Sequence, residues 1–144
     1  MKKIFAGIGI TIFCIITIVF LFSSCEKQRM MDYYSNEENY ITVSGTLTHI
    51  YSTDDTLCLG FSDVFFYSAD FNFVGDNLNI VKQKGIDEKL EKGKTIEFVT
   101  APGTWGDGYI YPIVEITIDG ETLLEFEEGF PNFLEYFKKN KNNW

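Results

Sequence analysis

The sequence predicts a small, mainly β domain: a barrel-like sheet with a short helix after its third strand and a longer helix at the C-terminal end. Apolar and hydroxyl side chains alternate over residues 40–51, which is the period of a half-buried strand. Phe130, Phe133, Leu134 and Phe137 are spaced as on one face of an amphipathic helix. With 144 residues, of which 45% are apolar, the chain can form one ordinary domain but not two large ones.

The first half of the domain is predicted to form three strands. Gly45 interrupts the apolar face of the long first strand, where a glycine often marks a bulge or a bend. A turn at residues 52–55 leads to a second strand over residues 57–61, and a Phe-rich stretch with Phe71 and Phe73 follows. A short helix is expected next.

That helix has recognisable ends. Asp76 or Asn77 is the expected N-cap, because short polar side chains bond the free amides of a first turn. Gly85 is the expected stop, and a further turn ends at Gly93.

The second half of the domain is predicted to add three strands, over residues 95–100, 110–118 and 122–126. Residues 119–120 are Asp-Gly, the pair typical of a two-residue hairpin turn with positive φ. The C-terminal helix is expected to be entered through Pro131, since the fixed φ of proline suits a first helical turn.

This order of elements resembles an OB-fold, in which a coiled first strand, two further strands, a helix and a fourth strand follow one another. The resemblance covers about residues 40–118 and makes residues 40–140 a single OB-like β-barrel domain with a sixth strand and a terminal helix added. It implies architecture and no activity, because one fold hosts many functions. A lipocalin-like or immunoglobulin-like sheet is the alternative, and the interposed helix counts against it.

The N-terminus has the pattern of an export signal. Two lysines precede residues 4–22, which carry no charge and, at about 1.5 Å a residue, would reach about 28 Å as a helix, close to the thickness of a bilayer core. Ser23 and Ser24 then precede Cys25. This pattern resembles the lipobox of bacterial lipoprotein signal peptides, although Phe22 stands where leucine is usual.

The resemblance implies that residues 1–24 are removed as a lipoprotein signal peptide and that Cys25 carries the lipid anchor, a site that palmitate would label. An uncleaved N-terminal helix is the alternative. Both place the lysines in the cytoplasm and the domain outside. We therefore expect a chain on the cell membrane at its extracytoplasmic face, with residues 25–39 as a tether and residues 141–144 as a tail.

The charge of the chain excludes a nucleic-acid role. Its formal net charge is -9, and residues 25–144 hold 21 acids against 10 bases. Such a field repels phosphates, whose neutralisation by Lys and Arg supplies most nucleic-acid affinity. The acidic charge therefore favours solubility or cationic partners.

The loop between the fourth and fifth strands is the candidate ligand loop. Residues 101–112 combine three glycines with several aromatic rings, and such rings beside a barrel can stack on ligands. The candidate residues are Trp105, Asp107, Tyr109 and Tyr111. A structural hairpin whose rings cover the barrel end is the alternative.

No catalytic constellation is apparent. His49 is the only histidine and has the parity of Val43, Leu47 and Tyr51, so we expect a hydrogen-bonded structural histidine, unless a bulge at Gly45 inverts that parity. No Ser or Cys motif accompanies it. The sequence therefore predicts a non-enzyme.

Nor is a cofactor or metal site expected. Cys58, the one thiol of the domain, lies in an apolar run and is expected to be buried and inert. Asp70 begins a segment like a calcium loop, but Val74 and Val81 stand where oxygen ligands are needed.

These observations predict a lipid-anchored binding or interaction module for a protein, glycan or small-molecule ligand. The alternatives are a cell-envelope hydrolase acting through Asp107 or another carboxylate, and a purely structural envelope lipoprotein.

We predict that palmitate fed to cells labels the wild-type chain and not Cys25→Ala, because only the thiol of Cys25 follows the small residues of the lipobox. Cys58→Ala serves as the matched control and should keep the label. Equal labelling of wild type and Cys25→Ala would contradict the anchor.

Overall fold

The computed structural model describes residues 25–64, 70–102 and 110–140, and the predicted signal peptide and tail lie outside these ranges. Two compact units are present, Met1–Tyr33 and Tyr34–Trp144. In the first, the described residues belong to a helix over residues 25–35, where Gln28 Nε2 donates a hydrogen bond of 2.8 Å to Asp32 Oδ1. Among all described residues, no helix is both long and apolar enough to span a bilayer.

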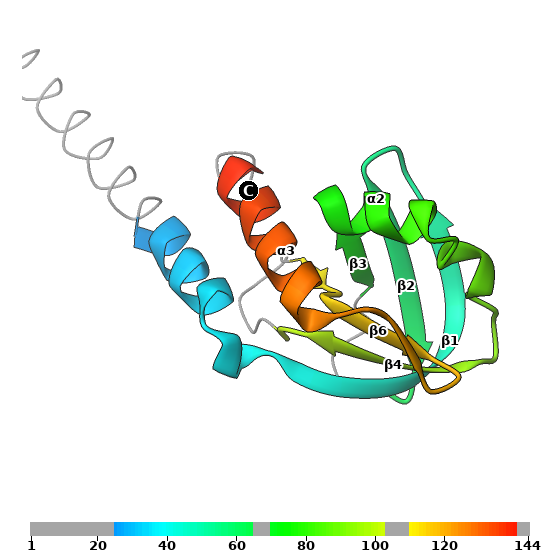
Figure 1. The fold of residues 1–144 in the computed structure, drawn as a ribbon. Helices are drawn as coiled ribbons and strands as arrows, with labels where there is room; N and C mark the ends of the chain where they lie inside the picture. The colour runs from blue at the N-terminus through cyan, green and yellow to red at the C-terminus, as the bar shows by residue number, and fades with distance from the viewer. Residues whose placement is uncertain (1–24, 65–69, 103–109, 141–144) are drawn as a thin grey trace, which may run out of the picture. The chain divides into compact units, whose positions relative to one another are not determined.

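The second unit is mostly β, a mixed seven-stranded sheet with helices packed on it (Figure 1). Its elements, in chain order, are η1 (Glu37–Asn39), β1 (Ile41–Ser52), β2 (Thr56–Ser62), β3 (Phe71–Val74), α2 (Gly75–Gln83), η2 (Asp87–Lys89), β4 (Thr95–Thr100), β5 (Tyr111–Pro112), β6 (Glu115–Ile118), β7 (Glu121–Leu124) and α3 (Phe126–Asn140). The predicted helix between the third and fourth strands and the predicted C-terminal helix are both confirmed.

The sheet has the order β5-β3-β2-β1-β4-β6-β7, with β5 and β7 at its edges. The long β1 joins the two halves of the sheet, because residues 41–46 pair with β4 and residues 46–52 with β2. All pairings between described strands are antiparallel except that of β3 with β5. Within the described residues the two edge strands are not paired with each other, so the sheet is open and the predicted closed barrel is not seen.

A bulge interrupts β1, but not at the predicted place. The register with β2 shifts between Leu47 and His49, so the extra residue is Thr48 and not Gly45. Gly45 pairs in regular register with Ile96 of β4, and a side chain there would meet Val64 and Phe61. Glycine at position 45 therefore permits close packing, and the bend lies three residues later.

The predicted strand over residues 110–118 is split into β5 and β6. At the break, the Ile113 N–H donates to the carbonyl of Asn72 at 2.9 Å, and the Val114 N–H donates to the carbonyl of Val99 at 3.0 Å. These consecutive residues therefore bond to β3 and to β4, on opposite sides of the segment. The turn after β6 is as predicted, with φ values of 55° at Asp119 and 81° at Gly120.

The core lies inside the curved sheet, under α2. It consists of the buried apolar side chains Leu47, Leu57, Leu59, Phe71, Phe73, Leu78, Val81, Ile86, Leu90, Ile96, Phe98, Ile113, Ile116, Ile118 and Leu124.

Tyr34 is also buried, although the sequence analysis assigned it to the tether over residues 25–39. Only 1% of it is exposed, and its hydroxyl donates to the carbonyl of Ile110 at 2.7 Å. Its ring lies against Phe133 and Phe137 of α3, with centroid distances of 5.2 Å and 4.9 Å. The folded unit therefore begins at Tyr34, six residues before the predicted start at residue 40.

Asn77 is not the cap of α2, as the sequence suggested, but a buried bridge to α3. The N-cap is Val74, which makes no side-chain cap bond. Asn77 Nδ2 donates to the carbonyl of Gly129 at 2.8 Å and lies 3.5 Å from that of Ile113. Gly129 itself packs so closely on the backbone of Val114 that a β-carbon there would collide with it.

The C-terminal helix starts at Phe126, five residues earlier than Pro131, where the prediction placed its entry. Pro131 therefore lies within the helix, where it lacks the N–H that would bond the carbonyl of residue 127 and its ring crowds that carbonyl. The additional turn carries Phe126 and Phe130, whose rings pack on Tyr40 at centroid distances of 5.8 Å and 5.1 Å. This packing extends the helix beyond its predicted start.

We predict that Asn77→Ala lowers the free energy of unfolding by about 1–3 kcal/mol, because two buried carbonyls each lose the hydrogen bond from its amide. Asn79→Ala, on the exposed side of α2, is the matched control and should change stability by less than about 0.5 kcal/mol. Urea unfolding followed by circular dichroism measures both. Equal effects of the two variants would contradict the bridging role of Asn77.

Candidate functional site

Because of the bulge at Thr48, His49 lies on the outer face of the sheet and not on the face of Val43 and Leu47. Its side chain is 51% exposed. Tyr51, two residues on, is 47% exposed and lies on the same outer face. The predicted parity of His49 with Leu47 is thus wrong, because the extra residue turns the following side chains over.

The rings of His49 and Tyr51 form a flat surface, which we call the His49–Tyr51 platform. Gly60 is the cross-strand partner of His49, and a β-carbon on it would collide with three atoms of the imidazole, so that ring lies flat over the glycine. Cys58 is the cross-strand partner of Tyr51. The two rings are parallel within 7°, with centroids 6.3 Å apart.

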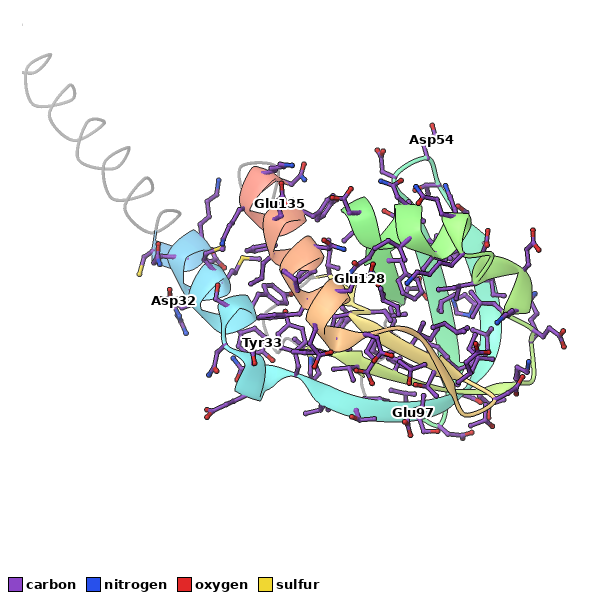
Figure 2. All side chains as sticks on the ribbon, viewed as in Figure 1. Asp32, Tyr33, Asp54, Glu97, Glu128 and Glu135 are labelled. Carbon is purple, nitrogen blue, oxygen red and sulfur yellow. The ribbon has the colours of Figure 1, made fainter. Side chains whose placement is uncertain are left out.

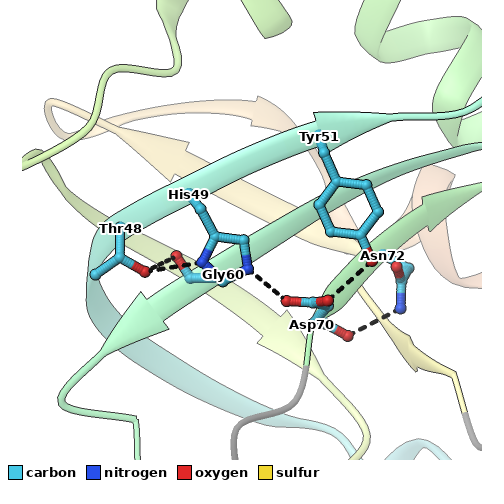
Figure 3. A network of polar contacts seen from close by, with 6 residues as sticks. All are labelled: Thr48, His49, Tyr51, Gly60, Asp70 and Asn72. Atoms are coloured by element: carbon cyan, nitrogen blue, oxygen red, sulfur yellow. Dashed lines mark hydrogen bonds and ion pairs between the residues drawn. The ribbon is translucent and has the colours of Figure 1, made fainter.

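Asp70, immediately before β3, holds both rings in place (Figure 3). His49 Nε2 lies 2.7 Å from Asp70 Oδ1, and the Tyr51 hydroxyl donates to Asp70 Oδ2 at 2.9 Å. Asn72 Nδ2 donates to the main-chain carbonyl of Asp70 at 2.9 Å, which ties the aspartate to β3. The platform is therefore built from β1, supported by β2 and fastened from the start of β3.

Thr48, the bulged residue, completes this network. Its hydroxyl donates to the carbonyl of Gly60 at 2.9 Å and also lies 3.2 Å from His49 Nδ1. Both imidazole nitrogens thus have a neighbour within the protein. The geometry fixes the ring and leaves its outer face to solvent.

The hydrogen-bonded neighbours of Tyr51 keep its phenol neutral. Its hydrogen bond with Cys58, followed by its hydrogen bond with Asp70, raises the pKa of Tyr51 above the ordinary value of 10.0. Burial likewise raises the pKa of the Cys58 thiol. Cys58 is only 5% exposed, which confirms the expected buried position. The described groups therefore offer aromatic surface and neutral polar atoms, without a thiolate nucleophile.

The electrostatic surroundings of the platform are acidic. No Lys or Arg occurs between Met30 and Val81, a stretch that supplies β1, β2 and β3 and holds eight acids. Asp54 is one of these acids, and Glu97 and Glu128 project from elements outside that stretch (Figure 2). The excess of acids over Lys and Arg in these strands and their connections disfavours anionic ligands.

The predicted ligand loop can be placed only in part. Trp105, Asp107 and Tyr109 lie outside the described residues. Tyr111 is in β5, half-buried, with its ring centroid 5.7 Å from that of Phe71 in the core. Its ring therefore contributes at least partly to packing.

Sequence reasoning did not identify the platform. Asp70 drew attention only as the start of a segment like a calcium loop, and Tyr51 only as part of a strand pattern. One sequence signal was available: Cys58 and Gly60 are small residues at alternate positions of β2. They lie on its outer face and leave room for rings from β1. The bulge at Thr48, which brings the rings there, has no signature in the alternation of residues.

A separate hollow of about 330 Å³ lies among the β1–β2 turn, the start of α2 and the end of α3. Its lining is Asp54, Asp55, Gly75, Asp76, Leu78, Asn79, Tyr136 and Asn140. Within the described ranges, no three or more His, Cys, Asp or Glu side chains are arranged to hold a metal ion.

Comparisons with known proteins give no assignment: the sequence matches no protein-family model and no curated protein.

We predict that Asp70→Asn lowers the pKa of Tyr51 towards 10.0, because the carboxylate that opposes a second negative charge is removed. Asp63→Asn, at an exposed turn, is the matched control and should leave the Tyr51 titration unchanged. The ring carbon shifts of Tyr51, followed by NMR as the pH is raised, report the titration. An unchanged midpoint in Asp70→Asn would contradict the contact.

Proposed function

We propose that this chain is a lipid-anchored extracytoplasmic binding module whose ligand face is the outer surface of β1, β2 and β3. The observation that carries the proposal is the His49–Tyr51 platform, in which two aromatic rings lie flat and open to solvent. Exposed rings that are fixed by hydrogen bonds lose little conformational freedom when a ligand stacks on them. Such pre-organisation is typical of binding sites.

We propose that the sheet is an opened OB-like barrel, a fold that would support a binding function. We propose that β5 and β6 are halves of one strand that passes from β3 to β4. Support comes from the consecutive residues Ile113 and Val114, whose amides bond to β3 and to the segment of β4 at Val99. In OB-folds, ligands bind on the face of the second and third strands, where the platform lies.

The anchor is proposed on Cys25, which is exposed in the described helix. Lipid there would leave only nine residues before Tyr34, where the folded unit begins. The module would then be tethered to the membrane by a short segment of the chain. Its partners would then be the membrane, through the lipid, and a ligand of the cell envelope.

A hydrolase is the second candidate, because Thr48, His49 and Asp70 form a hydroxyl–imidazole–carboxylate series. In nucleophilic catalysis the hydroxyl must pass its proton to the imidazole. Here the Thr48 hydroxyl donates to the carbonyl of Gly60 instead. This competing bond makes binding the better supported function.

The test is a thermal-shift screen of the full-length chain in detergent against oligosaccharides, peptides and divalent cations. We predict that ligands found in this way bind at least about tenfold more weakly to the double variant His49→Ala/Tyr51→Ala, because stacking on one ring contributes about 1–3 kcal/mol. Ile41→Ala, which removes another exposed apolar side chain of β1, is the control and should bind normally.

Ligands that bind the double variant as tightly as the wild type would contradict the proposed face. Turnover of an envelope substrate that is lost in Thr48→Val would instead favour the hydrolase.

A further inference from the structure

We propose that the ligand of the His49–Tyr51 platform is an uncharged oligosaccharide, of which two neighbouring sugar rings stack on the two aromatic rings. This inference rests on the proposed binding face and adds the chemical class of its ligand. It follows from the shape of the platform, from the polar atoms at its edge and from the charge around it.

The shape of the platform suits a chain of saturated rings. The imidazole lies flat over Gly60, and the phenol ring of Tyr51 is parallel to it within 7° with its centroid 6.3 Å away, so both rings lie flat on the outer face of the sheet. The imidazole lies against Gly60 beneath it, so only its outer face is open to a ligand. A pyranose presents C–H groups on one face, and successive sugars of a linear chain can each cover one ring.

The edge of the platform offers acceptors for hydroxyl groups. A carboxylate has about four lone-pair sites, and Asp70 uses one on each oxygen for His49 and Tyr51. The remaining sites lie beside the stacked surface, and the Asp70 side chain is 33% exposed. A sugar that stacks on the rings can therefore donate a hydroxyl to the same carboxylate that positions them.

The surroundings argue against an anionic ligand. Base stacking on aromatic platforms in nucleic-acid-binding proteins is combined with a positively charged groove that follows the phosphates. Here the sequence between Met30 and Val81 contains eight acids and no Lys or Arg. The platform therefore has the stacking surface of such a protein without the cations needed to hold a polyanion.

A cationic ligand is also disfavoured by the composition of the platform. Cation–π binding needs an electron-rich ring, for which Trp, Tyr and Phe are suited. One half of this platform is an imidazole, which becomes cationic itself when it is protonated. An uncharged polyol is the ligand class that fits the stacking surface, the free acceptor sites of Asp70 and the absence of Lys and Arg in these strands.

Isothermal titration calorimetry on the full-length chain in detergent tests the inference with four probes: cellotetraose, chitotetraose in its N-acetylated form, spermine and oligothymidylate. We expect at least one of the two tetrasaccharides to bind, and Tyr51→Ala and His49→Ala each to weaken that binding at least tenfold. Tyr51→Phe keeps the ring and should retain most of the affinity. Ile41→Ala is the matched control and should bind as the wild type does.

The possible failures are distinguishable. The sugar inference is overturned if neither tetrasaccharide binds at millimolar concentration while spermine or oligothymidylate does. If Tyr51→Ala also weakens the binding of that charged probe, the proposed binding face stands. If a tetrasaccharide binds equally to wild type, Tyr51→Ala and His49→Ala, both are overturned. Circular dichroism of each variant separates loss of the platform from loss of the fold.

Discussion

The pairing of one long strand with two neighbours governs this structure. The first part of β1 bonds to β4 and the second part to β2, so the strand must curve to serve both. The extra residue at Thr48 allows Leu47 and Ile50 to face the core while His49 and Tyr51 face outward. The same irregularity thus shapes the sheet and creates its exposed aromatic surface, because a bulge changes both local twist and the direction of side chains.

A buried amide links both helices to the sheet, in addition to their apolar packing. Asn77 of α2 bonds the carbonyl of Gly129 in α3 and reaches that of Ile113, between β5 and β6. The carbonyl of Ile113 lies where the chain passes from pairing with β3 to pairing with β4, so the amide satisfies a polar group at an irregular point of the sheet. Buried carbonyls without donors are costly, which makes a polar side chain preferable here to an apolar one of the same size.

Local patterns predicted much of the fold. Alternation predicted β1, β2 and β4 to within a few residues, and the Asp119–Gly120 turn has the positive φ that its sequence requires. The errors occurred where tertiary contacts outweigh local preference. Asn77 is drawn from the helix cap into the core by two carbonyls, and Pro131 lies inside a helix extended by ring packing.

The candidate site was harder to predict, because it needs a register shift that no residue pattern shows and an aspartate twenty-one positions from His49. Gly60 offers a way to follow the site across evolution. A side chain larger than hydrogen at this position would displace the imidazole but would still allow the strands to pair. A single substitution at position 60 could therefore remove the platform and keep the fold. Among homologous chains, glycine at this position would therefore identify those that keep the aromatic surface, whatever their overall similarity.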